Sequence, residues 1–489
     1  MNVYDYLMRE SGFLYKDFLL GNAEQMSYPE LMHESLKLAR YLKTRHGEHN
    51  NILLVSPNSG FFLVAYLAIM KSGNVCVPLN PSIEPGNLAF IRKRCAAEIA
   101  FVAPRLNDER WKGMRVYSSL EQIPDTSYES PPTPDEAETF DEERLAEIIF
   151  TSGSTGEPKG VMISHGNIIA NTDSIIRYLQ LTGDDTMLVV LPFYYCYGLS
   201  LLHTHLKVGG SIVFNNSFMF LGTVIKDLKN YHCTGFAGVP SHFQVLLRKS
   251  RSFRDEDFPA LRYVTQAGGK LHKAFISEFM ESQPGILFYV MYGQTEATAR
   301  LSYLPPAMLP EKLGSLGKAI PGVDLRLVAE DGSMIQEANK PGELIARGGN
   351  IMKGYLGDEE ETAATIRDGW LHTGDIAYMD EDGYFYHQAR IKEIIKVGGR
   401  RISPKEIEEV IVSIPGVVDC SISAVSDDVL GEALKADIVV SDMNSEIVNE
   451  SLFKKLCGEK LAREKIPQFI QFSNRLEVAP TGKKLKKGS

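Results

Sequence analysis

The sequence predicts an α/β fold, with a large N-terminal domain of layered sheets and helices, a small β subdomain, and a smaller α+β C-terminal domain. Through most of the chain, short apolar runs typical of buried strands alternate with helical patterns, as in parallel sheets with helical crossovers. Between about residues 314 and 386 the pattern changes to short strand-like runs separated by Asp-Gly and Pro-Gly turns. Such turns connect short strands, which indicates the β subdomain.

The first predicted elements form a strand–helix–strand unit. Residues 27–42 have apolar positions at helical spacing, and Ser27 is a suitable N-cap. Residues 51–56 (NILLVS) have the pattern of a buried strand, residues 61–71 that of a helix, and residues 75–79 that of the next strand. Elements of these lengths in this order predict parallel pairing.

A stretch rich in Pro, Asp and Glu at residues 119–143 is predicted to be an exposed connector. After it, further buried strands are predicted at residues 146–150, 187–191, 211–214, 235–239 and 286–289. Strands and helices mix again in the last part of the chain. We place the domain boundary near residues 389–392, which gives domains 1–389 and 390–489.

Composition excludes several classes of function. The formal net charge of −10 argues against nucleic acid as the main partner. The longest apolar run, residues 61–70, is about half of what a membrane-spanning helix needs, so we expect no membrane insertion. The N-terminus has no signal-peptide pattern, and the six cysteines are scattered without a C-x-x-C pair. A reducing cytoplasm is the expected setting.

A glycine- and hydroxyl-rich loop is the strongest local signal. Residues 151–160 (TSGSTGEPKG) directly follow the predicted strand 146–150. Glycines permit close approach to a ligand, and successive backbone N–H groups can form an anion nest. Four hydroxyls and Lys159 add donors that suit phosphate oxygens. The loop is not a Walker A motif, because G-x-x-x-x-G-K-[ST] is absent. A flexible surface loop is the alternative.

The same string resembles the phosphate loop of the adenylate-forming enzymes, a superfamily of acyl-CoA synthetases, luciferases and peptide-synthetase adenylation domains. Further motifs follow in the family's order along nearly the whole chain. The resemblance implies that ATP binds to this loop and that Thr155 contributes to a Mg²⁺ site. The expected nucleotide-binding residues of the loop are Thr151, Ser152, Gly153, Ser154, Thr155, Gly156 and Lys159.

Residues 292–296 (YGQTE) resemble the family's adenine and magnesium motif. The resemblance implies that the Tyr292 ring lies against adenine, which is favourable stacking chemistry. Gly293 and Gln294 would also contact the nucleotide. Thr295 would touch the α-phosphate, and Glu296 would hold Mg²⁺, a cation that takes oxygen ligands.

Three further motifs imply nucleotide contacts. Residues 267–269 (AGG) resemble the segment between nucleotide and acyl group, where Gly268 and Gly269 let the backbone approach the adenine. Residues 370–375 (WLHTGD) resemble the ribose motif, with Asp375 accepting the ribose hydroxyls. Arg390 would also contact the ribose.

The resemblance also implies a mobile C-terminal domain. Lys392 lies where the family's hinge residue absorbs a rotation between two half-reactions. Gly398 and Gly399 resemble the loop that lines the tunnel for the pantetheine arm of the thiol substrate. Lys483, in a P-T-G-K context, resembles the catalytic lysine of adenylation. Ala389 stands where the family usually has Gly, which is a departure from the pattern.

Departures from the family pattern bear on the acid. Tyr195 replaces a His found in many acyl-CoA ligases, and tyrosine is a poor base at neutral pH. Cys196 replaces the Asp of α-amino-acid activators, and a thiol cannot pair with an ammonium as strongly, so an α-amino acid is disfavoured. The aromatic residues around them either line the pocket or belong to the core. The expected acid-binding residues are Tyr194, Tyr195, Cys196, Phe236, Gly238 and Arg300.

Gly238, Gly268 and Gly269 are expected to leave room for a sizeable aryl or fatty acid. For Arg300, two interpretations stay open: recognition of a second acidic group, or a surface ion pair. His203 and His205 are interpreted as structural residues on one strand-like face rather than as metal ligands.

Together these features predict an acid–thiol ligase that uses ATP and Mg²⁺ to form an acyl-AMP with release of pyrophosphate. The acyl group then passes to coenzyme A. One alternative is a stand-alone adenylation enzyme that loads an acyl or amino acid on the phosphopantetheine of an acyl carrier protein. Another is a catalytically silent nucleotide-binding protein. The nucleotide product separates a ligase, which forms AMP, from an ATPase, which forms ADP.

Overall fold

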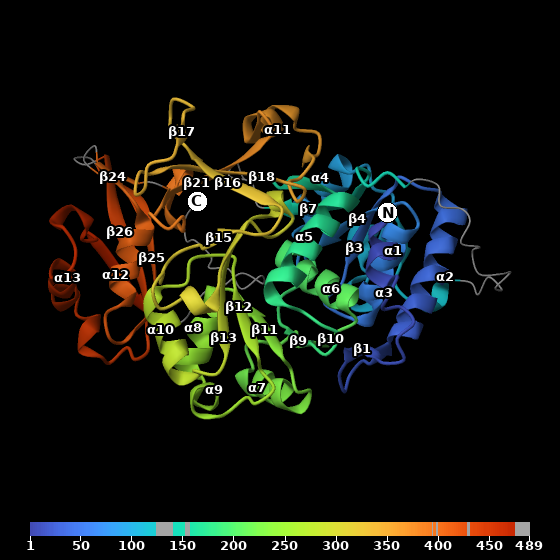
Figure 1. The fold of residues 1–489 in the computed structure, drawn as a ribbon, viewed down its shortest axis with the longest axis horizontal. Helices are drawn as coiled ribbons and strands as arrows, with labels where there is room; N and C mark the ends of the chain where they lie inside the picture. The colour runs from blue at the N-terminus through green and yellow to red at the C-terminus, as the bar shows by residue number, and fades with distance from the viewer. Residues whose placement is uncertain (124–139, 152–156, 394, 398–399, 428–430, 475–489) are drawn as a thin grey trace.

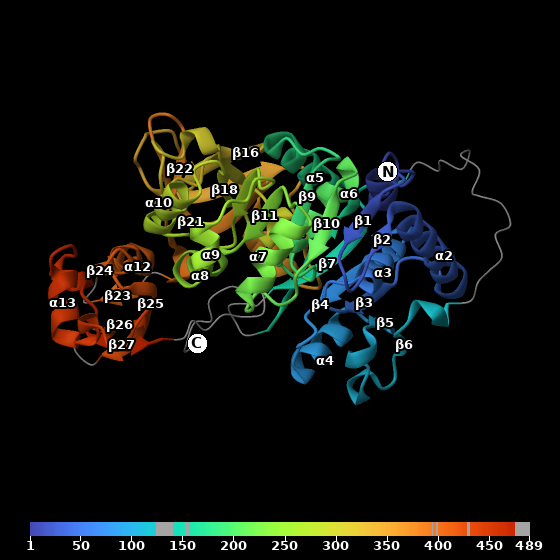
Figure 2. The ribbon, with the colours of Figure 1, turned by 90° about the horizontal axis from the view of Figure 1, so that it is seen from below.

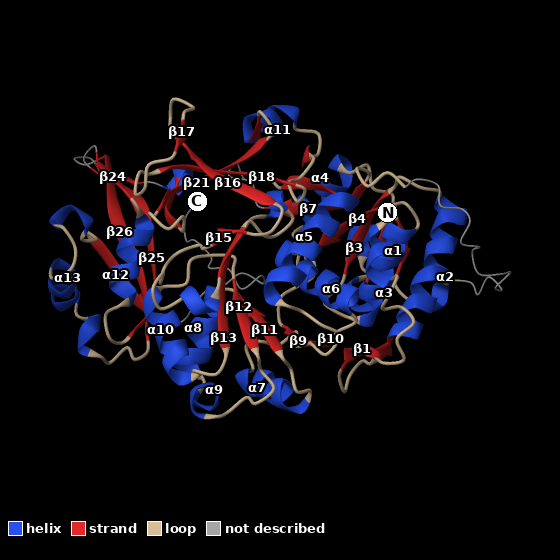
Figure 3. Cartoon of the chain, in the orientation of Figure 1, coloured by secondary structure: helices blue, strands red, loops and turns tan. Residues whose placement is uncertain are grey.

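The computed structural model describes residues 1–123, 140–151, 157–393, 395–397, 400–427 and 431–474. In this part of the chain the strands form four sheets, and helices cover the faces of the two larger ones (Figures 1 and 3). The α/β class predicted from the sequence is confirmed. The sheets are called first to fourth below.

The first sheet has a parallel centre, with β3, β4, β5 and β7 side by side, and an antiparallel edge where β8 and β19 follow β7. Its order and bounds are β19 (Gly354–Tyr355), β8 (Lys159–Ser164), β7 (Leu145–Thr151), β4 (Val75–Leu79), β3 (Asn51–Val55), β5 (Ile99–Val102) and β6 (Arg115–Tyr117).

The second sheet is parallel from β1 through β13 and antiparallel at both edges. Its order is β15 (Lys318–Ala319), β14 (Ser302–Leu304), β13 (Leu287–Tyr292), β12 (Tyr263–Gln266), β11 (Gly235–Gly238), β9 (Thr186–Val189), β10 (Ser211–Phe214), β1 (Asp17–Leu20) and β2 (Met26–Ser27).

Helices between these two sheets join them through one hydrophobic core. Side chains of α3, α5 and α6 pack with residues of β4, β7 and β8 on one side and of β9, β10 and β12 on the other. Helices α8 and α10 cover the opposite face of the second sheet, and α4 that of the first. The bounds are α1 (Val3–Met8), α2 (Tyr28–His46), α3 (Gly60–Lys71), α4 (Pro85–Arg94), α5 (His165–Leu179), α6 (Cys196–Val208), α7 (Leu221–Asn230), α8 (Pro240–Lys249), α9 (Arg251–Asp255) and α10 (Lys273–Ser282).

Local sequence explains where several elements begin. Ser27 caps α2, because its backbone N–H donates to Glu30 at 2.8 Å while the Glu30 N–H donates to its hydroxyl at 3.3 Å. The predicted strands at 51–56 and 75–79 and the helix at 61–71 match β3, β4 and α3 within one residue at each end. The predicted connector largely coincides with residues 124–139, which lie outside the described residues.

The third sheet is the predicted β subdomain. Its path is β17 (Met334–Ile335), β16 (Val323–Val328), β18 (Gly342–Gly348), β21 (Trp370–Met379) and β20 (Ile366–Arg367), and β22 (Phe385–Arg390) pairs with β21. Helix α11 (Glu359–Thr365) lies between β19 and β20 in the chain. The Asp380–Gly383 segment, with one of the predicted Asp-Gly turns, is a hairpin turn between β21 and β22.

The fourth sheet belongs to the C-terminal part, shown in orange and red to one side of the molecule in Figures 1 and 2. It contains β24 (Arg400–Ile402), β23 (Ile395–Val397), β26 (Gly431–Val440), β25 (Val417–Asp427) and β27 (Phe469–Ser473), with α12 (Pro404–Val412) and α13 (Glu450–Gly458). Lys270 binds Glu409 at 2.6 Å and Gln244 of α8 donates to Asp419 at 3.1 Å, so this part docks against α8 and the segment that follows β12.

One predicted element is wrong. His203 and His205 lie on helix α6, not on a strand. Their structural role agrees with the geometry: His203 Nε2 lies 2.7 Å from the Tyr66 hydroxyl, and His205 Nδ1 lies 2.9 Å from the Leu201 carbonyl oxygen. Among the described residues, no helix has the length and apolar character needed to cross a membrane.

Candidate active site

Predicted site residues gather where neighbouring parallel strands of the second sheet end. Strand β11 ends at Gly238, β12 ends just before Gly268 and Gly269, and β13 ends at Tyr292. Because β11, β12 and β13 are adjacent and parallel, their carboxyl ends share one edge. Such an edge is a common ligand-binding position in α/β folds. Gly268 has φ +81°, a conformation that favours glycine.

Asp375, the predicted ribose acceptor, is a buried carboxylate with several donors. The Tyr292 hydroxyl donates to its Oδ2 at 2.6 Å, and Arg390 Nε donates to its Oδ1 at 2.9 Å. His387 Nε2 lies 3.2 Å from the same Oδ1. Burial alone would raise the pKa of Asp375, but the His387 hydrogen bond and the Arg390 charge outweigh it and hold the pKa below its ordinary value. Asp375 therefore stays an ionised acceptor at neutral pH.

The turn that follows β13 carries Thr295 and Glu296 in a short 3-10 helix, η4 (Thr295–Ala297), with Gln294 as its N-cap residue. A Cβ at Gly293 would lie 2.0 Å from the carbonyl oxygen of Ala299, so only glycine fits where the chain folds back. Buried Thr295 has its hydroxyl 3.5 Å from the Cys196 sulfur. The turn thus brings the expected α-phosphate contact next to the expected acid pocket.

Glu296 and Lys159 meet at Tyr355, a residue that the sequence analysis missed. The Tyr355 hydroxyl donates to Glu296 Oε1 at 2.8 Å. The Lys159 ammonium lies 5.3 Å from the centre of the Tyr355 ring and forms an ion pair with Glu361. Lys159 opens β8 and pairs in register with Thr151 at the end of β7, so the described ends of the predicted phosphate loop lie at this site.

Glu296 is the described side chain that fits the implied Mg²⁺. Mg²⁺ bound with a nucleotide takes one or two carboxylates together with phosphate oxygens. In the described part of the chain, Glu296 Oε1 accepts from Tyr355 and Oε2 has no hydrogen-bond donor. The described residues hold no group of three or more His, Cys, Asp or Glu side chains arranged for a metal.

Arg300 lies in the interior, so the surface ion pair considered from the sequence is wrong. Its exposure is 2%, and its guanidinium carbon lies 4.0 Å from the centre of the Tyr197 ring. Its Nη1 donates to the Ala299 carbonyl at 3.2 Å, and its Nε lies 3.4 Å from the Met291 sulfur. No carboxylate of the described residues forms an ion pair with it. Arg300 is thus a buried cation without an anionic partner in that part of the chain.

The predicted acid-binding residues divide into two groups. Tyr194, Tyr195 and Cys196 are consecutive at the start of α6, where Tyr195 is the N-cap residue and Cys196 the first residue. Of these three, Cys196 lies beside Thr295. Burial raises the pKa of Tyr194 to about 12 and that of Cys196 to about 11, so both side chains stay protonated at neutral pH.

Phe236 is not brought to this group. It is fully buried and packs 5.8 Å from the Phe243 ring, in the core between the second sheet and α8. Its neighbour Ala237 belongs instead to the core cluster that contains Tyr197. Gly238 has the Phe243 ring and His242 close behind it, where an added Cβ would lie 3.0 Å and 3.1 Å from them.

Several predicted residues lie outside the described residues: Ser152, Gly153, Ser154, Thr155, Gly156, Gly398, Gly399 and Lys483. Lys392 lies in a 3-10 helix, η6 (Ile391–Glu393), between β22 of the third sheet and β23 of the fourth. Its hinge role and the domain boundary beside it stay predictions.

Comparisons with known proteins agree with this geometry. Residues 12–356 match the family model of AMP-binding enzymes, and residues 406–483 match the model of the AMP-binding enzyme C-terminal domain. A feruloyl-CoA synthase of an Amycolatopsis species is 32% identical over 470 residues, covering 94% of this chain and 92% of that protein. A 2-succinylbenzoate–CoA ligase of Bacillus pumilus (strain SAFR-032) is 32% identical over 409 residues, covering 84% and 81%.

A solved structure extends the similarity to three dimensions. ATP-bound MatB from Rhodopseudomonas palustris has a TM-score of 0.88 at 26% identity, covering 99% of this chain and 97% of that chain. The sequence motifs, the two matching domains and the similar fold lead to one conclusion: the chain belongs to the family of AMP-binding enzymes.

Proposed function

We propose that the protein is an acid–thiol ligase that activates a carboxylic acid with ATP and transfers the acyl group to coenzyme A. Family membership and relatives named as CoA synthases and ligases support the reaction class. The observation that carries it is the strand edge where the motif of Tyr292 and Glu296 meets Asp375 of the WLHTGD motif. Asp375 and Arg390 would bind the ribose, and Tyr292 would flank the adenine.

In the first half-reaction a carboxylate oxygen attacks the α-phosphorus of ATP, and the bond from that phosphorus to pyrophosphate breaks. Two anions meet, so positioned positive charge lowers the barrier. We assign Thr295 and Lys483 to the α-phosphate, and Lys159 with the loop of residues 151–156 to the leaving pyrophosphate. Mg²⁺, held by Glu296 with Thr155, supplies further positive charge to the phosphate oxygens when bound.

In the second half-reaction the thiol sulfur of coenzyme A attacks the acyl carbon, AMP leaves, and the thiol proton passes to solvent. Burial keeps the Cys196 thiol and the Tyr194 hydroxyl protonated, so neither serves as a nucleophile or base. We propose that rotation about Lys392 brings Gly398 and Gly399 to the site for this step. The free, buried state of all six cysteines supports a reducing, cytoplasmic setting.

We propose further that the acid carries a second anionic group, which pairs with Arg300. A buried charge is costly unless it is paired, and Arg300 has an aromatic ring, a carbonyl and a thioether around it. Its neighbour Cys196 touches Thr295, so an anion at Arg300 would lie close to the proposed reaction centre. A dicarboxylic aryl or aliphatic acid fits this charge.

The test compares dicarboxylic acids with their monomethyl esters as substrates. The wild type should prefer the diacid by at least about tenfold in kcat/KM, and Arg300→Met should remove that preference. Arg248→Met is a matched control, because Arg248 also lies over a ring, Phe275, at 5.0 Å but pairs with Glu278 on the surface. An unchanged preference in Arg300→Met would overturn the Arg300 assignment and leave the ligase reaction standing.

Carrier-protein loading is the second candidate, supported by the same adenylation site. Product analysis separates the two acceptors. Coenzyme A thioester supports the main proposal, whereas transfer only to a phosphopantetheinylated carrier protein supports the second.

A further inference from the structure

A short segment, residues 352–361, ties the phosphate-loop hairpin to the Glu296 turn; we call it the strap. At its start, the Met352 N–H donates to the Glu296 carbonyl at 2.9 Å. Lys353 N–H then donates to Met162 at 2.8 Å, and Leu356 N–H to Gly160 at 2.8 Å, so β19 runs antiparallel along β8. The strap therefore fixes two candidate phosphate-binding motifs that are far apart in the chain.

Tyr355, in the middle of the strap, contacts the charged group of each motif. Its hydroxyl donates to Glu296 Oε1 at 2.8 Å, and the Lys159 ammonium lies 5.3 Å from its ring centre. The backbone holds it in place, because its N–H donates to the Thr362 hydroxyl at 2.8 Å and its Cα pairs in register with Val161. With 7% of its surface exposed, the side chain has little freedom to leave this position.

Glu361, at the end of the strap, also pairs with Lys159. It lies in the first turn of α11, where its N–H donates to the Asp358 side chain at 3.0 Å. The Lys159 side chain is 17% exposed and that of Glu361 34% exposed, so the pair is partly shielded from water. Lys159 thus contacts both a carboxylate and an aromatic face, and these two contacts restrain its position.

We propose that Tyr355 is a positioning residue of the polyphosphate site, which orients Glu296 through its hydroxyl and Lys159 through its ring. This inference rests on the proposed function, in which Glu296 holds Mg²⁺ and Lys159 contacts pyrophosphate. The hydrogen bond from the Tyr355 hydroxyl restrains the Glu296 carboxylate at Oε1. Oε2 would then be left to bind the cation. Donors and ligands that are held in place before the reaction contribute more than flexible ones.

The two contacts of Tyr355 can be separated by substitution. Tyr355→Phe keeps the ring beneath Lys159 and removes only the hydrogen bond to Glu296. Glu361→Gln keeps Tyr355 and removes the charge that pairs with Lys159. Tyr303→Phe is the control for loss of a hydroxyl, because Tyr303 stacks on Tyr178 at 4.2 Å and its hydroxyl has no protein partner in the described residues.

The readout is ATP binding by titration calorimetry at a series of Mg²⁺ concentrations, which needs no turnover. Tyr355→Phe should weaken ATP binding about tenfold at limiting Mg²⁺, because a hydrogen bond to an ionised carboxylate is lost. Saturating Mg²⁺ should restore the wild-type affinity, and Glu361→Gln should leave the Mg²⁺ dependence unchanged. Tyr303→Phe should titrate as the wild type does.

Two results would overturn the inference while the proposed function stands. One is that Tyr355→Phe binds ATP as the wild type does at every Mg²⁺ concentration. The other is that Tyr355→Phe loses the same ATP affinity at every Mg²⁺ concentration, which would mark a merely structural role. If the wild type shows no Mg²⁺-dependent ATP binding, the proposed function fails and the inference fails with it. A Glu296→Gln titration identifies this case, since it should abolish the Mg²⁺ dependence if Glu296 is a ligand.

Discussion

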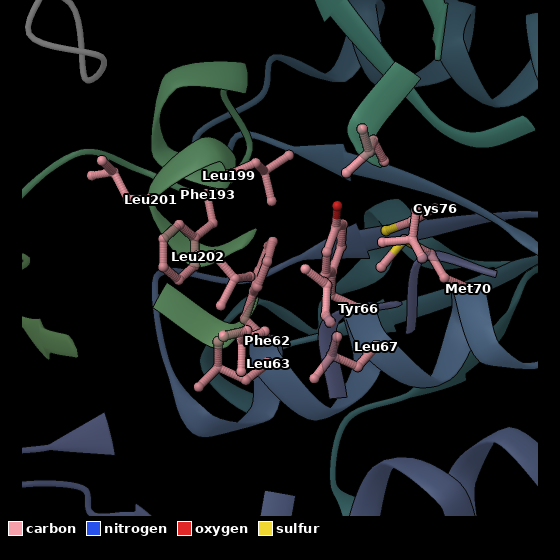
Figure 4. Close-up of a cluster of buried hydrophobic side chains, with 14 of the residues drawn as sticks. Phe62, Leu63, Tyr66, Leu67, Met70, Cys76, Phe193, Leu199, Leu201 and Leu202 are labelled. Carbon is pink, nitrogen blue, oxygen red and sulfur yellow. The ribbon is translucent and has the colours of Figure 1, made fainter. Parts of the chain in front are cut away.

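Glu147→Gln should change how the stability of the first sheet depends on pH. Glu147 lies on β7 with 1% exposure, and its Oε2 accepts from the Tyr66 hydroxyl at 2.7 Å. Figure 4 shows Tyr66 between Cys76 and a group of apolar side chains that includes Phe62. Burial in these surroundings raises the pKa of Glu147 to about 7, although the Tyr66 hydrogen bond opposes the shift.

The sign follows from proton binding. In the unfolded chain this carboxyl ionises near its ordinary value of 4.5, whereas the folded protein keeps the proton until about pH 7. Its contribution to the free energy of unfolding is therefore fully present below pH 4.5 and is lost as the pH rises to 7. The loss amounts to about 3 kcal/mol. Because a Gln side chain does not titrate, the Glu147→Gln variant should not lose this stability as the pH rises.

Trp111 provides the assay. It is one of two tryptophans in the chain, is 2% exposed, and packs in the same cluster as Ile148, the neighbour of Glu147. In a Trp370→Phe background its fluorescence reports unfolding of the first sheet. Urea unfolding of the parent protein and of the Glu147→Gln variant, at a series of pH values from about 5 to about 8, gives the difference in stability at each pH. We expect that difference to shift by ~2.5 kcal/mol in favour of the variant across the series, because the first part of the loss already occurs below about pH 5.

His203 does not confuse this comparison. Burial lowers its pKa to about 3, so it is neutral in the folded protein at every pH tested. In the unfolded chain His203 binds a proton below about pH 6.5. This makes the free energy of unfolding rise with pH, opposite to the effect of Glu147, but the rise is the same in both proteins. A difference between the proteins that stays constant over the whole pH series would refute the buried, protonated Glu147.

Three further predictions concern the proposed reaction. Asp375→Asn should weaken ATP binding by about 10²-fold, measured by calorimetry, because the ionised acceptor that Tyr292 and Arg390 orient is lost; wild-type affinity would contradict the ribose role. Lys483→Ala should slow acyl-AMP formation by about 10²–10³-fold but spare transfer from supplied acyl-AMP to the thiol, and normal pyrophosphate release would exclude the assigned role. Lys392→Pro should slow thioester formation while pyrophosphate release persists, because proline restricts the backbone in η6; equal loss of both steps would count against a hinge.

Local signals in the sequence predicted much of the fold and the order of the site motifs. The Ser27 cap and the apolar run of β3 each depend on residues close together in the chain. The assignment of α6 failed for a physical reason. Residues 196–206 are buried on every side, so the helix shows no amphipathic period.

Long-range pairs could not be predicted in this way. Tyr355 reaches Glu296, and Glu361 reaches Lys159, only because β19 pairs with β8 at the edge of the first sheet. Phe236 and Ala237 are neighbours in sequence but face different cores, which depends on how the second sheet is covered. For Arg300, the sequence left open recognition of a second acidic group or a surface ion pair, and the burial of the side chain excluded the surface ion pair.

The central claim is that the protein joins a carboxylic acid to a thiol through an adenylate. The most direct measurement is pyrophosphate and AMP release against a panel of fatty, aryl, dicarboxylic and amino acids, with and without coenzyme A. We predict pyrophosphate release that depends on one class of non-amino acid, and AMP with a coenzyme A thioester when the thiol is present. Formation of ADP and phosphate, or no pyrophosphate with any acid of the panel, would contradict the account.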